Sequence, residues 1–335
     1  MIAGSRIYFQ EFSLASKVVL IETGEVALRC LDSSNHAGLV SANKNKQEVI
    51  AMAESLESFK SYIGKRETAT DVVTASAMLK FAATLGQENP PLEKGAPIPP
   101  GWYGAFFPAS HRPSQMRTDG QASGGGIVPP IPLPRRRIGG TRVSFQEPLR
   151  IGDEITRVTE IADIRIDDGP NGAMVTVIER NSISNSRGLA VVEERDMVML
   201  SEARAEAAPS AVPTVPAQAT WLEMIEPNPP LLFRFSAIRF NCHRIHYDRD
   251  YVTKVEKLPG LVVQSSLVSQ LLMEMCRKEL PGRQLKSFDF KSARQIYDTG
   301  KFTIAGTPAK DGREAELWAL DSDGRVAMTA TAKFA

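Results

Sequence analysis

The sequence predicts an α+β protein in two similar halves, each an antiparallel sheet wrapped around a helix. The segment 201–220 is rich in alanine and proline and lacks large apolar side chains, which is typical of a semi-rigid linker. On both sides of this linker, a helix pattern, an irregular stretch and four strand patterns follow in the same order. A long apolar helix followed by antiparallel strands favours a sheet that encloses the helix.

The linker divides the chain into a first half at 52–200 and a second half at 221–335. A length of 335 residues is sufficient for two domains. Residues 1–51 have no counterpart in this scheme, and Met52 followed by a helix pattern resembles a natural start. We therefore expect residues 1–51 to be a disordered extension or an upstream addition to the reading frame.

The first half opens with a helix pattern over 72–85 and an irregular segment over 87–92. A central helix is expected at 96–107, but three prolines and a glycine interrupt that segment, so the helix should be short. Alternating apolar residues then predict four strands, at 142–146, 154–166, 173–184 and 190–200.

The second half opens with a shorter helix pattern at 236–240 and an irregular segment at 241–246. Apolar residues then recur at helical spacing from Val262 to Cys276, until Pro281 and Gly282 end the helix. Four strands are predicted after it, at 286–291, 301–306, 314–320 and 326–334.

The charge of the chain is balanced. Forty basic and 39 acidic residues give a net charge of +1, which argues against a general nucleic-acid or membrane surface. No apolar run approaches the roughly 18 residues of a membrane span. The longest basic run, Arg135–Arg137, stands between prolines and glycines and is expected to be a solvated loop.

Three scattered cysteines are too few for a disulfide framework or a zinc site. They indicate the cytoplasm or another reducing compartment. The mitochondrion is the alternative if residues 1–51 act as a transit segment, although three glutamates make them a poor one. No nucleotide-binding or metal-ligand spacing appears, so we expect no nucleotide cofactor and no metal.

The segment with the strongest chemical signal runs from Phe240 to Asp248. It contains two of the four histidines, His243 and His246, and the long helix pattern begins shortly after it. A proton-transfer group is thereby placed near a helix N-terminus, where backbone N–H groups can stabilise an oxyanion.

His-Arg-Ile-His-Tyr-Asp at 243–248 and Pro-Gly-Leu-Val-Val at 259–263 resemble the signature of the MaoC-like, hot-dog-fold enoyl-CoA hydratases. The likeness is closer to the two-domain branch that hydrates mesaconyl-C4-CoA and itaconyl-CoA, to which 3-hydroxyacyl-thioester dehydratases are related. Asp-Gly at 119–120, Pro-Pro-Ile-Pro-Leu-Pro-Arg-Arg at 129–136 and Pro-Leu-Arg-Ile-Gly-Asp at 148–153 carry it in the first half.

The resemblance implies a double hot-dog fold with one active site, in the second half. The first half has Leu92 at the position of His246, and leucine cannot transfer a proton. It implies an acyl-CoA substrate whose coenzyme A is not a separate cofactor, and it allows a homodimer. In two-domain relatives, the gap left by a shortened first helix accommodates the acyl group.

The resemblance also assigns roles at the site. His246 is the expected base, and Asn241 stands where single-domain relatives have an aspartate that shares the water. An amide can orient water but cannot take its proton, so His246 acts alone or with a carboxylate such as Asp248. Asp248 could instead cap a turn or hold the tautomer of His246, and we favour this reading.

Gln264-Ser265 replaces the usual His-Gly of the pattern. The expected oxyanion donor is the backbone N–H of Ser265, and Gly260 belongs to the same substrate-binding segment. Serine would be strained there if the backbone required a positive φ.

A substrate carboxylate needs a cation that a fatty-acyl chain does not. The candidates are Arg135, Arg136, Arg294 and Arg244, because the planar guanidinium suits a carboxylate. The leading hypothesis is a hydratase of short dicarboxylyl-CoA thioesters. The alternatives are a dehydratase of 3-hydroxyacyl-CoA or acyl-carrier-protein substrates and, from another class, an inactive hot-dog protein that binds acyl thioesters.

Overall fold

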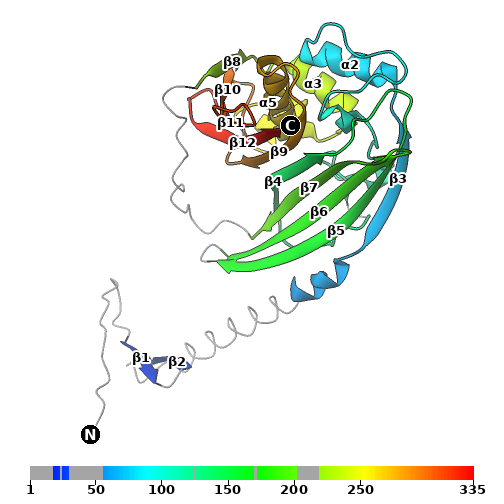
Figure 1. Ribbon diagram of the computed structural model, residues 1–335. Helices are drawn as coiled ribbons and strands as arrows, with labels where there is room; N and C mark the ends of the chain where they lie inside the picture. Colours follow the sequence, from blue (N-terminus) through cyan, green and yellow to red (C-terminus); the bar gives the residue numbers. More distant parts are fainter. Residues whose placement is uncertain (1–17, 23–24, 30–55, 124–125, 170–171, 202–218) are drawn as a thin grey trace. The chain divides into compact units, whose positions relative to one another are not determined.

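The computed structural model describes residues 56–123, 126–169, 172–201 and 219–335, together with two short strands nearer the N-terminus (Figure 1). These strands, β1 (Val18–Glu22) and β2 (Glu25–Arg29), form an antiparallel hairpin. The rest of the expected extension and most of the linker lie outside the described residues. Contacts separate Met1–Ser58 from a compact unit, Phe59–Ala335, which contains both predicted halves.

One antiparallel sheet of ten strands runs through this unit, in the order β3-β5-β6-β7-β4-β9-β12-β11-β10-β8 (Figure 1). The first half supplies β3 (Arg66–Val72), β4 (Arg135–Phe145), β5 (Glu154–Gly169), β6 (Gly172–Asn185) and β7 (Gly188–Leu200). The second half supplies β8 (Trp221–Ile225), β9 (Leu285–Ser292), β10 (Phe302–Pro308), β11 (Glu314–Leu320) and β12 (Val326–Phe334). The halves meet where β4 pairs with β9, between Gly140–Ser144 and Ser287–Lys291.

The sequence patterns missed β3 and β8, which are the edge strands, and placed the start of β4 too late. The run Arg135–Arg137 is not a loop, because it pairs with Val198–Leu200 of β7. Its side chains are exposed, as expected for a charged run.

The long helix α5 (Ser265–Glu279) packs against β9, β10, β11 and β12. Its counterpart in the first half is reduced to the 3₁₀ helix η2 (Trp102–Ala105), as the prolines predict. This short helix docks on α5, because Trp102 Nε1 donates to Glu274 Oε1 at 2.7 Å and Gln270 Nε2 donates to the Pro100 carbonyl at 3.1 Å.

The shorter helices are α2 (Ala75–Leu85), α3 (Pro229–Ile238), α4 (Arg249–Lys254), η1 (Ser58–Tyr62), η3 (Pro113–Gln115) and η4 (Arg244–His246). Helix α3 begins seven residues before the predicted helix, because Asn228 caps it and Pro229 suits the first helical turn. Phe235 of α3 and Trp102 of η2 both pack on Phe81 of α2, so the core joins the two halves.

Candidate active site

The end of α3 and the start of α5 are held together by Gln264, the N-cap residue of α5. Its amide nitrogen donates to Ser236 Oγ at 2.8 Å and to the Leu232 carbonyl at 3.0 Å. The Asn241 N–H donates to the Ser236 carbonyl at 2.8 Å. Asn241 and the N-terminus of α5 are therefore both tied to the same residue of α3.

His246 is fixed against the segment that precedes α5. Its Nδ1 lies 2.7 Å from the Val262 carbonyl, and the Val262 N–H donates to the Ile245 carbonyl at 2.9 Å. A carbonyl can only accept, so Nδ1 carries the proton and the neutral ring has its lone pair on Nε2. Burial lowers the pKa of His246 to about 4, so the ring is neutral at pH 7 and Nε2 can accept a proton.

A loop of the first half packs against the segment that contains His243 and His246. The ring of His243 lies edge-on to that of His246, with centroids 5.4 Å apart, and Gln121 Nε2 approaches His243 Nδ1 at 3.0 Å. Gly120 has φ +85°, and a Cβ atom there would collide with the Cys242 carbonyl. The Asp-Gly pair of the first half is thus needed for close packing on the histidine segment.

The first N–H groups of α5 are available to a ligand. Those of Ser265 and Ser266 make no hydrogen bond within the described part of the chain. A helix N-terminus with free N–H groups favours a negatively charged oxygen. Ser265 does not have a positive φ, so serine occupies the usual glycine position without backbone strain.

Gly260 has a structural reason to be glycine. A Cβ atom there would lie 2.6 Å from Asp298 Oδ1, which accepts from the Leu261 N–H at 2.8 Å. The Asp298 side chain is 1% exposed and pairs with Arg249. This buried carboxylate therefore fixes the turn that leads to Val262 and α5.

Asn241 keeps a side-chain hydrogen-bonding group without a partner in the described residues, whereas the carboxylate of Asp248 is engaged. Asn241 Oδ1 accepts from the His243 N–H at 3.1 Å, and its amide nitrogen has no partner within the described residues. Asp248 caps α4 by accepting from the Tyr251 N–H at 3.0 Å and forms an ion pair with Arg244 at 2.8 Å. The Val262 carbonyl, not Asp248, holds the tautomer of His246. These contacts support the capping role that was favoured for Asp248.

The arginines expected to bind a carboxylate do not gather at His246. Arg135 and Arg136 are exposed at the start of β4, about 30 Å along the strand from Phe145 at its end. Arg294 pairs with Asp321 at 3.5 Å. Arg244 is already engaged with Asp248.

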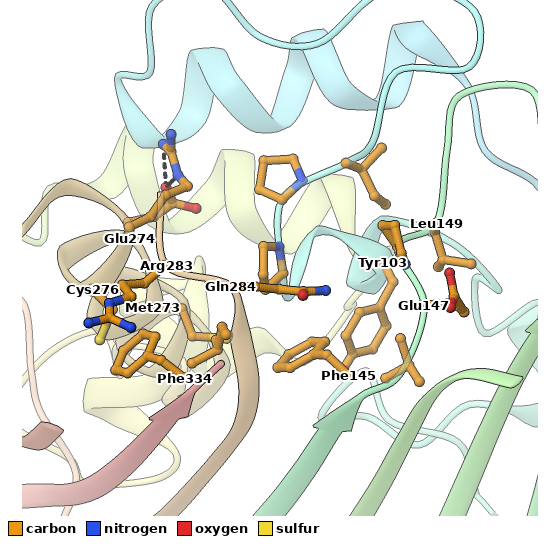
Figure 2. A pocket seen from close by; sticks show the side chains of 17 residues that line it. Tyr103, Phe145, Glu147, Leu149, Met273, Glu274, Cys276, Arg283, Gln284 and Phe334 are labelled. Atoms are coloured by element: carbon orange, nitrogen blue, oxygen red, sulfur yellow. Dashed lines mark hydrogen bonds and ion pairs between the residues drawn. The ribbon is translucent and has the colours of Figure 1, made fainter. Parts of the chain in front are cut away.

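A cavity of about 220 Å³ lies further along α5, beside its C-terminal half (Figure 2). Phe145 of β4 and Leu285 of β9 line it at the junction of the two halves, together with Tyr103 and Met273. Met273 is about 12 Å beyond Ser265 along the helix axis. The cavity is therefore distinct from the immediate surroundings of His246.

No sequence pattern singled out Gln121 or Ser236, and Gln264 stood out only as a departure from a signature. Gln121 follows the Asp-Gly pair directly, which is the one signal that could have indicated it. Within the described residues, no cluster of histidine, cysteine or carboxylate side chains could hold a metal, and no helix is long and apolar enough to cross a membrane.

Comparisons with known proteins agree with this architecture. A family model described as hydroxyacyl-thioester dehydratase type 2 matches residues 101–298. The mesaconyl-C(4)-CoA hydratase of Chloroflexus aurantiacus is 36% identical over 270 residues, covering 81% of this chain and 95% of that protein.

Solved structures give the same fold. A MaoC-like dehydratase from Phytophthora capsici superposes with a TM-score of 0.59 at 12% identity, covering 81% of this chain and 95% of its own. A Mycobacterium tuberculosis protein described as having a double hot-dog fold gives 0.51 at 11% identity, covering 82% and 96%. The predicted double hot-dog fold is confirmed.

The fold and the relatives together define a hydro-lyase. The chain belongs to the hydroxyacyl-thioester dehydratase type 2 family and has the double hot-dog fold.

Proposed function

We propose that this protein adds water to a C5 dicarboxylyl-CoA thioester, mesaconyl-C4-CoA or itaconyl-CoA, to give citramalyl-CoA. The observation that carries the proposal is a neutral His246 with Nε2 free to accept a proton, tied through Val262 to the start of α5. The hydratase from Chloroflexus, similar over almost its whole length, supports this substrate class.

The residues divide the reaction between them. His246 Nε2 takes a proton from water while the oxygen attacks the β-carbon. The N–H groups of Ser265 and Ser266 hold the thioester oxygen as it becomes enolate-like. The imidazolium then returns its proton to the α-carbon, and the histidine is neutral again. The free amide nitrogen of Asn241 orients the water or a substrate oxygen but transfers no proton.

The runner-up is dehydration of a 3-hydroxyacyl-CoA or acyl-carrier-protein substrate, the same chemistry in reverse, which the family model supports. An inactive thioester-binding protein was suggested by Asn241 and Gln264-Ser265. It is disfavoured because Ser265 is unstrained and Gln264 anchors α5. A cytoplasmic location and a homodimer remain proposals.

The test compares substrates on the purified protein. Hydration of mesaconyl-C4-CoA and of crotonyl-CoA is followed by loss of enoyl absorbance, and dehydration of 3-hydroxybutyryl-CoA by its gain. We expect kcat/KM to be highest for mesaconyl-C4-CoA. Better turnover of crotonyl-CoA or of longer enoyl-CoA would favour the dehydratase reading instead.

A further inference from the structure

The sheet of the first half carries a row of buried polar side chains where a central helix would normally require apolar ones. Thr159, Asn181 and Glu193 lie opposite one another on β5, β6 and β7, each less than 10% exposed. Thr159 Oγ1 donates to Asn181 Oδ1 at 2.8 Å. Buried polar groups of this kind are uncommon in a sheet face that serves only packing.

Glu193 is already satisfied. It pairs with Arg195 and accepts from the Tyr103 hydroxyl, whose pKa is raised well above its usual value by burial and by Glu193, so that it stays protonated. Glu179 lies 3.9 Å from Arg195 and also accepts from Asn181 Nδ2. The charge of Arg195 is therefore matched by carboxylates of the protein.

Arg239, unlike Arg195, forms no ion pair with a carboxylate in the described part of the chain. Its guanidinium makes no hydrogen bond or ion pair within the described residues. It lies against Gly104 and 5.7 Å from the ring centroid of Phe235. Burial, and then the charge of Arg195, lower its pKa from the ordinary value. The charge of Glu193 acts in the opposite direction, but it forms no ion pair with Arg239. A half-buried guanidinium without hydrogen-bond acceptors is costly unless a ligand supplies them.

The position of Arg239 connects it with the reacting groups. It is the C-cap residue of α3, two residues before Asn241 and three after Ser236, which contacts Gln264 at the start of α5. Its guanidinium reaches from this helix end to η2, at Gly104. Its side chain therefore contacts the first half, while its backbone belongs to the helix end that leads into the histidine segment.

The substrate chemistry requires a cation at such a place. In mesaconyl-C4-CoA the free carboxylate is bonded to the same carbon that water attacks, so its partner must lie close to the base. We infer that Arg239 binds this carboxylate and selects dicarboxylyl-CoA over simple enoyl-CoA substrates. This inference rests on the proposed function, and it assigns to Arg239 the role that the sequence had suggested for Arg135, Arg136 or Arg294.

The test uses three variants, each assayed with mesaconyl-C4-CoA and crotonyl-CoA. Arg239→Gln removes the charge. Gly104→Ala keeps the charge but displaces the guanidinium, since the new Cβ would collide with Nη1. Arg234→Gln is the matched control, because Arg234 lies on the same helix, is exposed and donates a hydrogen bond to the Ala83 carbonyl.

We expect Arg239→Gln to lower kcat/KM for mesaconyl-C4-CoA by about 30- to 1,000-fold. We expect kcat/KM for crotonyl-CoA to fall by less than about threefold, since crotonyl-CoA has no carboxylate for Arg239 to bind. Gly104→Ala should also lower kcat/KM for mesaconyl-C4-CoA more than kcat/KM for crotonyl-CoA. Arg234→Gln should leave the ratio of these two kcat/KM values unchanged. Equal losses on both substrates, or none, would overturn the inference while the proposed function stands. An unmodified protein that prefers crotonyl-CoA would defeat the proposed function, and the inference with it.

Discussion

His246 should remain an effective base at a pH where an ordinary histidine has stopped working. With a pKa of about 4, about nine tenths of the rings are neutral at pH 5. With the unperturbed value of about 6.5, only about 3% would be neutral. Because protonation removes the lone pair of Nε2, activity is lost on the acid side. The shift therefore corresponds to about 30-fold more active enzyme at pH 5.

The measurement is kcat/KM for crotonyl-CoA between pH 4 and pH 8, because kcat/KM reports ionisations of the free enzyme. Crotonyl-CoA is used because its acyl group has no carboxylate that titrates in this range. Circular dichroism at each pH separates loss of activity from unfolding. An acid limb with an apparent pKa near 6.5 would show that His246 is not desolvated as the structure has it, or is not the base.

Three further substitutions test the surroundings of the site. Gly120→Ala should lower the melting temperature and the hydration rate together, because the residue has φ +85° and its new Cβ would displace a carbonyl of the histidine segment. Asp298→Ala should cost about 1–3 kcal/mol of unfolding free energy in urea, since a buried N–H loses its acceptor; an unchanged midpoint would contradict this. Asn241→Asp should move the acid limb of activity to higher pH, because a carboxylate near His246 favours the imidazolium. An unmoved limb would place residue 241 too far from the ring.

The sequence predicted the elements whose patterns are set by the core. Strands β11 and β12 have the predicted bounds, and α5 was found from its apolar repeat. Edge strands β3 and β8 bury few side chains, with patterns of mostly exposed residues, so periodicity could not indicate them. The start of α3 was missed because Pro229 and Pro230 suggested a break in the helix. Both in fact lie in its first turn, where proline is tolerated.

The site could be predicted only where its residues are close in the sequence. His246 and the start of α5 lie within 20 residues and share a signature. Arg239 meets Gly104 across 135 positions, and Gln121 meets His243 across 122, through folding of one half against the other. No local pattern records such contacts, which is why Arg239 was not among the arginines chosen from the sequence.

The most direct test of the central claim is turnover of mesaconyl-C4-CoA by the unmodified protein, by His246→Ala and by His111→Ala. His111 is an exposed histidine and serves as the matched control. Formation of citramalyl-CoA is followed by mass spectrometry and by loss of enoyl absorbance. We expect kcat to fall by about 10²–10⁴ in His246→Ala, the usual contribution of a general acid–base group, and to be unchanged in His111→Ala. Near-normal turnover by folded His246→Ala would show that another group moves the proton.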